Sequence, residues 1–98
     1  MKLRIALLQM HVEMGNPKVN FAHARDMMEK AMEKKPDLLV LPETWNTGFF
    51  PKENLSLLAD EEGKETCSLL SSIAASQGVH IVGGTTAVKV GQDIYNRT

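Results

Sequence analysis

A carboxylate followed by aromatic side chains is the feature of this sequence best suited to chemistry. Glu43 comes directly after an apolar run, Leu38–Leu41, that ends in Pro42. Three aromatic residues follow within seven positions: Trp45, Phe49 and Phe50. Aromatic rings can exclude water from a carboxylate, and a desolvated carboxylate is suited to act as a general base near neutral pH. The pattern indicates a general base at Glu43, with a solvated or lysine-paired glutamate at a strand end as the alternative.

The other side chains that could bind a metal or act as a nucleophile form no recognisable set. The three histidines share no ligand spacing with one another or with the single cysteine, Cys67, so we expect no metal site. Cys67 falls on the first turn of a predicted helix whose apolar face continues at Leu70 and Ala74. Because a buried helical cysteine behaves as a small hydrophobic residue, we expect Cys67 to pack in the core.

Length and composition describe one ordinary globular domain. The 98 residues are 43% hydrophobic and 23% charged, enough for one core. The net charge of −1 offers no basic excess for nucleic acid, and no apolar run approaches the ~18 residues of a membrane span. Gly15 stands alone, so the sequence has no glycine-rich phosphate loop. One cysteine fits a reducing compartment, and we expect a cytoplasmic α/β domain.

Apolar strands that alternate with amphipathic helices must position Glu43. The segments 3–9, 38–41 and 79–82 are short apolar runs, and we expect the first to be buried on both faces. A helix from Pro17, capped by Asn16 or Asn20, and a second helix over 64–77, ended by Gly78, lie between them. This order predicts right-handed crossovers and parallel strands, with Glu43 at their carboxyl edge.

The rest of the chain adds a short helical turn and a hairpin. We expect the turn within residues 52–60, and a solvated loop over 60–63. Strands over 85–90 and from 94 flank a turn at 91–93, and this hairpin is expected to make the sheet mixed. Since the last residues read as the middle of a strand, we expect residues 1–98 to be part of a longer domain.

The segment around Glu43 resembles a known family. Residues 38–49, LLVLPETWNTGF, are similar to the first catalytic segment of the nitrilase superfamily of carbon–nitrogen hydrolases. Residues 5–9 resemble the first strand of that family, and residues 78–85 and 93–96 resemble its next sheet segments. The resemblance covers nearly the whole chain in order, and the nearest branch is that of the omega-amidase-like enzymes.

The resemblance implies a fold, a reaction and a set of site residues. The fold is an α-β-β-α sandwich, of which this chain is the N-terminal part, with a Glu-Lys-Cys catalytic set and no metal or organic cofactor. Only the glutamate carries over, onto Glu43, while the lysine and the cysteine are expected beyond residue 98. Trp45, Thr47 and Phe49 follow the base and are expected to shape the substrate pocket. The implied substrate is a small amide that bears a carboxylate, and the implied assembly is a homodimer or larger homo-oligomer.

Other functions stay open at this point. A non-catalytic ligand-binding α/β domain is one alternative, although the missing phosphate loop argues against a nucleotide ligand. An inactive truncated product that keeps only subunit association is another. Nitriles, carbamoyl compounds and plain amides are all possible substrates.

Overall fold

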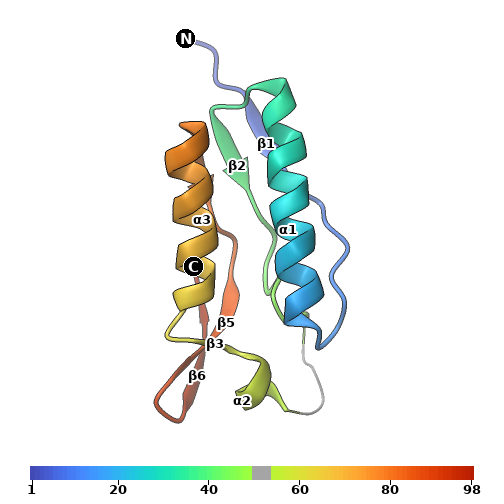
Figure 1. Ribbon diagram of the computed structural model, residues 1–98, viewed down its shortest axis with the longest axis vertical. Coiled ribbons are helices and arrows are strands. Elements are labelled where there is room, and N and C mark those ends of the chain that lie inside the picture. The colour runs from blue at the N-terminus through green and yellow to red at the C-terminus, as the bar shows by residue number, and fades with distance from the viewer. Residues whose placement is uncertain (50–53) are drawn as a thin grey trace.

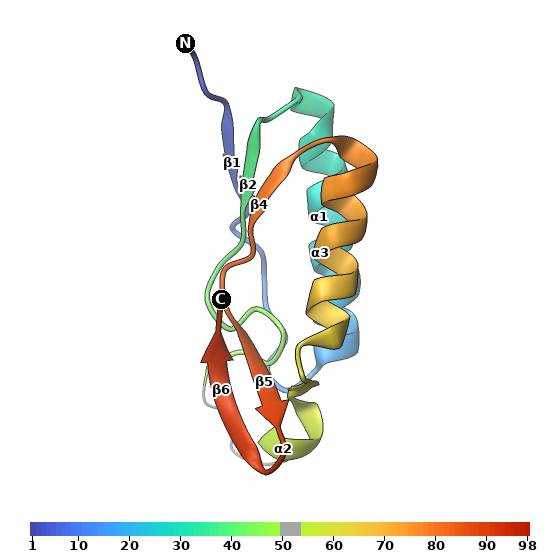
Figure 2. The ribbon, with the colours of Figure 1, turned by 90° about the vertical axis from the view of Figure 1, so that its left-hand side faces the viewer.

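The chain forms two layers, with the helices on one side of the strands. The computed structural model describes residues 1–49 and 54–98. Helices α1 (Pro17–Ala31) and α3 (Lys64–Gln77) both lie against the same side of the strands, as Figures 1 and 2 show. No described element covers the opposite side. None of the described helices is long and apolar enough to cross a membrane.

Three of the strands form a parallel sheet. The order is β1 (Ile5–Leu7), β2 (Leu38–Val40) and β4 (His80–Val82), with β2 in the centre. Leu39 pairs with Ala6 on one side and with Ile81 on the other. The predicted strand–helix–strand units are therefore confirmed, and the carboxyl end of β2 points toward the hairpin half of the molecule (Figure 2).

The hairpin makes a sheet mixed, as expected, but this is a second sheet and not the one formed by the three parallel strands. Strands β3 (Asp60–Glu61), β5 (Thr86–Val90) and β6 (Asp93–Arg97) form this sheet in the order β3-β5-β6. β3 runs parallel to β5, and β6 runs antiparallel to it. The chain leaves the first sheet at residues 83–85, where Gly84 adopts a left-handed φ of +60°. A left-handed residue interrupts extended backbone, so β5 starts a new ladder.

Local signals in the sequence set the helix ends. The Asn16 side chain accepts a hydrogen bond from the backbone N–H of Val19 at 3.3 Å, so Asn16 is the N-cap and Pro17 the first helical residue of α1. Gly78 ends α3 in a left-handed conformation, as predicted. A 3-10 turn (Met32–Lys34) follows α1, and a single turn, α2 (Leu55–Leu58), lies within the segment predicted to be helical.

Residues 60–63 are only in part the solvated loop that we expected, since Glu61 and Glu62 are exposed but Asp60 and Glu61 form β3. Asp60 is buried, and as the first residue of β3 it pairs with Val88 of β5. Its carboxylate accepts hydrogen bonds from the backbone N–H groups of Glu65 at 3.0 Å and Thr66 at 2.7 Å. Asp60 thus satisfies the free N–H groups at the start of α3, where the N-cap position is Gly63 and offers no side chain.

The hydrophobic core lies between the helices and the parallel sheet. Phe21 and Met28 of α1, Leu39 of β2 and Ile73 of α3 are among its buried members. The expectation that the first strand is buried on both faces is wrong for the described residues, since Ile5 and Leu7 are 48% and 71% exposed. Alternate residues of a strand face opposite ways, and only one face of this sheet is covered by helices.

Candidate active site

Glu43 lies just past the carboxyl end of β2, on a segment that we name the Glu43 loop (residues 42–48). Ligands of open α/β sheets gather at this edge. The Glu43 side chain is exposed, and its Oε1 accepts a hydrogen bond from Nδ2 of Asn96 on β6 at 3.2 Å. The expected aromatic enclosure of this carboxylate is absent from the described residues. The carboxylate is instead open to solvent and fixed at one oxygen.

The chain between β4 and β5 holds the Glu43 loop in place. The backbone N–H of Thr44 donates to the Thr85 hydroxyl at 2.8 Å, and the N–H of Trp45 donates to the Thr85 carbonyl at 3.2 Å. In return, the N–H of Thr85 donates to the carbonyl of Pro42 at 3.2 Å. These three hydrogen bonds flank Glu43 on both sides, so its backbone is fixed to the start of the second sheet.

Gly84 permits this close approach. A Cβ atom added to Gly84 would overlap the carbonyl oxygen of Pro42 and would lie 2.6 Å from that of Leu41. Real side chains do not tolerate such contacts with backbone atoms. Gly84 also has a φ of +60°, which other residues adopt only at a cost. Glycine at this position therefore lets the two connections cross directly beside the base.

Trp45 faces the core, not a pocket mouth. It is fully buried, with its ring edge-on to that of Phe21 at a centroid distance of 4.9 Å. Its Nε1–H donates to the carbonyl of Gly83 at 2.8 Å. This ring anchors the Glu43 loop to α1 and to the chain after β4, and a buried tryptophan needs such a partner for its N–H. Phe50, the other ring expected near the carboxylate, lies outside the described residues.

Two asparagines that the sequence analysis did not place at the site connect the loop to both layers. The Asn46 side chain donates to the carbonyl of Ala87 at 3.0 Å and accepts from its N–H at 2.9 Å. Asn20, which we had considered only as a helix cap, is buried on α1 and donates to the carbonyl of Asn46 at 2.8 Å. It also bonds both backbone groups of Glu13. The sequence shows an asparagine at each of these positions, but the residue type alone indicates neither burial nor a hydrogen-bond partner.

Thr44, the residue after the base, is held in an unfavourable conformation. Its φ is +47°, which is unusual for a β-branched residue and costs about 1–2 kcal/mol. Its hydroxyl oxygen is buried and has no hydrogen-bond partner among the described residues. Strain of this kind persists only where the surroundings fix the backbone, and it clusters at functional sites.

A cavity of about 320 Å³ lies beside the Glu43 loop. Its lining includes Thr44, Thr47 and Phe49 of the chain after β2, and Tyr95 and Asn96 of β6. Thr47 is 1% exposed, whereas Phe49 is 50% exposed. Of the three predicted pocket residues, Thr47 and Phe49 therefore line this cavity and Trp45 does not. The cavity is also lined by Thr44, which follows Glu43, and by Asn96, which is hydrogen-bonded to it.

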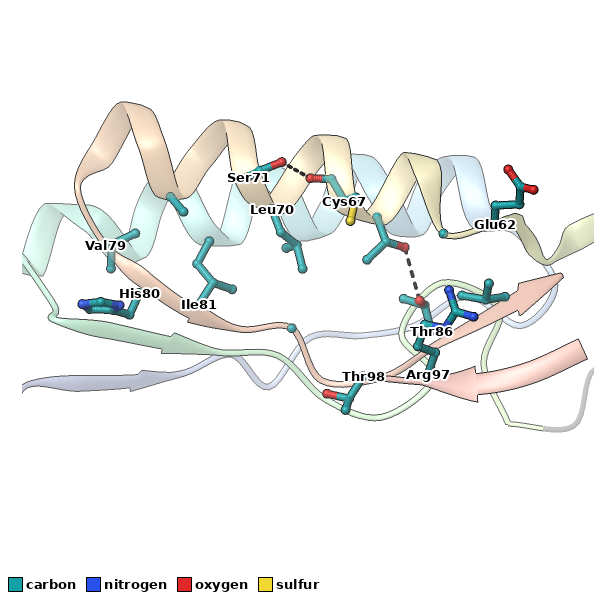
Figure 3. Close-up of a pocket in the computed structure, with 15 residues that line it drawn as sticks. Glu62, Cys67, Leu70, Ser71, Val79, His80, Ile81, Thr86, Arg97 and Thr98 are labelled. Carbon is teal, nitrogen blue, oxygen red and sulfur yellow. Dashed lines mark hydrogen bonds between the residues drawn. The ribbon is translucent and has the colours of Figure 1, made fainter. Parts of the chain in front are cut away.

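Cys67 is exposed, and the expectation that it packs in the core is wrong. The buried stripe of α3 runs through Leu69 and Ile73. Since each residue turns an α-helix by about 100°, Cys67 points roughly 200° away from Leu69. Figure 3 shows its sulfur directed into a second cavity of about 490 Å³, between α3 and the strands. The described part of the chain holds no group of three or more His, Cys, Asp or Glu residues that could bind a metal ion.

Comparison with known proteins establishes the family. The carbon-nitrogen hydrolase family matches residues 4–98. The chain belongs to the carbon-nitrogen hydrolases. Within this family it is 44% identical over 96 residues to 2-oxoglutaramate amidase of Bacillus subtilis (strain 168), covering 98% of this chain and 36% of that protein. It is 30% identical over 99 residues to the chloroplastic omega-amidase of Arabidopsis thaliana, covering 97% of this chain and 27% of the relative.

Solved structures of carbon-nitrogen hydrolases share the fold. A CN-hydrolase superfamily protein from Xanthomonas campestris matches 96% of this chain with a TM-score of 0.79 at 26% identity. A Saccharomyces cerevisiae member of branch 10 of the nitrilase superfamily matches 96% of the chain with a TM-score of 0.75 at 24% identity. This chain covers 34% and 37% of these structures. It therefore spans about a third of the length of the relatives that it matches.

Proposed function

We propose that this chain supplies the general base, Glu43, of an amidase that hydrolyses a small amide bearing a carboxylate. The observation that carries the proposal is the position of Glu43. Its carboxylate is exposed at the carboxyl edge of the parallel sheet, on a loop fixed from both sides and beside a cavity. A fixed backbone and an accessible carboxylate are what a general base needs. The names of the amidases to which the chain is similar support this substrate class.

The proposed reaction passes through a thioester, with a cysteine and a lysine from the remainder of a complete domain. Glu43 takes the proton of the thiol as sulfur attacks the amide carbon. It then gives this proton to the nitrogen as the carbon–nitrogen bond breaks and ammonia leaves. Next it accepts a proton from the water that attacks the thioester, and the thiol leaves reprotonated. The lysine stabilises the negative oxygen of each tetrahedral intermediate.

Thr47 and Phe49 are proposed to line the substrate pocket, and Trp45 to hold the loop from inside. In the cavity beside the Glu43 loop, the ring of Phe49 would contact the carbon chain of the substrate. Asn96 adds a polar side chain to the lining of the same cavity. We also propose that the complete domain is an α-β-β-α sandwich. The uncovered face of the parallel sheet, with Ile5 and Leu7 exposed, supports a further layer on that side.

A fusion enzyme tests the function. Residues 1–98 replace the matched segment of the Bacillus subtilis relative, so that the rest of the domain is supplied. We expect this fusion to hydrolyse 2-oxoglutaramate, and Glu43→Gln to lower kcat by about 10²- to 10⁴-fold at unchanged Tm. Glu29→Gln, on the exposed side of α1, is the matched control and should keep full activity. The 98-residue chain alone should show no turnover.

The same measurements can refute the proposal. A Glu43→Gln fusion that keeps its kcat but melts at a lower temperature would show that Glu43 has only a structural role. Turnover by the isolated chain above that of its Glu43→Gln variant would place a complete catalytic set within residues 1–98.

A further inference from the structure

Within residues 1–49 and 54–98, one side chain is hydrogen-bonded to the carboxylate of the proposed base. Asn96 lies on β6, 53 residues after Glu43, and its Nδ2 donates to Oε1 of Glu43 at 3.2 Å. Neither ion pair found among the described residues involves Glu43. Its second carboxylate oxygen, Oε2, has no hydrogen-bond partner within residues 1–49 and 54–98.

The position of Asn96 is set by the same contacts that fix the loop. Asn96 is paired with Ala87 in the β5–β6 hairpin. The other edge of Ala87 is bonded twice to the side chain of Asn46, within the Glu43 loop. The loop is therefore hydrogen-bonded to β5 at Ala87, and Asn96 lies opposite Ala87 in the antiparallel β5–β6 ladder. The amide of Asn96 thus meets the carboxylate from a strand that is paired in the second sheet, and the hydrogen bond itself is exposed to solvent.

We propose that Asn96 is a positioning residue for the general base. It holds Oε1 of Glu43, so that Oε2 is the oxygen that takes and returns the proton. This inference rests on the proposed function, because it concerns the orientation of the same base. Asn96, which the sequence did not indicate as a site residue, is thereby placed in the wall of the proposed active site.

The chemistry of an amide suits this task. The side-chain NH2 of asparagine donates hydrogen bonds but carries no charge. It can fix one carboxylate oxygen without the strong stabilisation of the ionised form that a neighbouring lysine or arginine would give, and such a cation would weaken the base. The side-chain oxygen Oδ1 of Asn96 also stays available at the cavity, where a substrate amide or departing ammonia needs an acceptor.

Kinetics of the fusion enzyme test the inference. Asn96→Ala should lower kcat by about 10- to 100-fold, with KM and Tm nearly unchanged, because a hydrogen bond to a charged group is lost from the base. Asn96→Asp keeps the shape but places a second carboxylate beside Glu43. Since like charges disfavour ionisation, the acidic limb of the kcat/KM profile should move to higher pH.

Two comparisons make the result specific. Gln92→Glu adds the same charge at the exposed hairpin turn, about 13 Å along the strand from Asn96, and should leave the pH profile unchanged. Because Asn96 acts through Glu43, adding Asn96→Ala to Glu43→Gln should cause no further loss of kcat. A purely structural role of Asn96 would instead give additive losses and an unmoved pH profile.

The outcomes separate this inference from the proposed function. An Asn96→Ala enzyme with kcat within threefold of the parent, while Glu43→Gln is inactive, overturns the inference alone. Full activity of Glu43→Gln overturns both. A loss of kcat in Asn96→Ala that vanishes when the assay is run well below its Tm reports unfolding, and it also overturns the inference.

Discussion

The side chain of Asn46 pairs with the backbone of Ala87 as a neighbouring strand would. It accepts from the N–H of Ala87 at 2.9 Å and donates to its carbonyl at 3.0 Å. β3 covers only part of this edge of β5, since it pairs with Val88 and Lys89. Asn46 thus continues the ladder for one residue and joins the Glu43 loop to the second sheet.

This pairing predicts that Asn46 is important for stability. Asn46→Ala removes both hydrogen bonds that this side chain makes to the buried backbone of Ala87, and each such loss costs about 1–3 kcal/mol. We expect the free energy of unfolding to fall by about 2–5 kcal/mol in urea denaturation. Asn16→Ala removes one exposed capping bond and should cost only about 1 kcal/mol. Equal losses in the two variants would contradict the proposed importance of the Asn46–Ala87 pair.

A second prediction compares two glycines that have nearly the same positive φ. Gly84 and Gly91 have φ values of +60° and +63°, but a Cβ on Gly91 would meet nothing within 4 Å. Gly91→Ala therefore carries only the left-handed backbone cost of about 1–2 kcal/mol. Gly84→Ala adds the overlap with Pro42 and should cost more than about 4 kcal/mol or prevent folding. Similar Tm values for the two variants, measured by circular dichroism, would disprove the close approach of residues 41–42 and 84.

A third prediction concerns Cys67. Because its side chain is exposed, Cys67→Ser should change the free energy of unfolding by no more than about 0.5 kcal/mol. The folded chain should react with a thiol reagent as fast as the urea-unfolded chain does, within about tenfold. In the fusion enzyme, Cys67→Ser should leave kcat within about twofold. Loss of turnover on this substitution would make Cys67 a catalytic residue.

The elements that the sequence predicted well are those set by local chemistry. The helix over 64–77 has the predicted ends, and Asn16 with Pro17 starts the first helix. The three apolar strands form the expected parallel sheet, since an alternation of strands and amphipathic helices has few ways to bury its apolar faces. The position of Glu43 at the carboxyl edge follows from that order alone.

The predictions that failed depended on partners distant in the sequence. Cys67 was expected in the core from its apolar neighbours three and seven residues on, but the buried stripe of α3 runs through Leu69 and Ile73 and leaves Cys67 exposed. Trp45 was expected at a pocket, yet its ring packs against Phe21. Helix periodicity and aromatic character show that a face is apolar, but they do not show which neighbour will cover it.

The sequence by itself determined the two long helices, the three parallel strands, their order and the place of Glu43, because hydrophobic periodicity, caps and turn residues act over a few positions. The tertiary structure alone decided what surrounds Glu43. Asn96 lies 53 residues away, and Thr85 and Gly84 lie about 40 residues away. Hydrogen bonds between such residues exist only after the sheets have formed, so no local pattern encodes them. The orientation of the base is a property of the assembled fold.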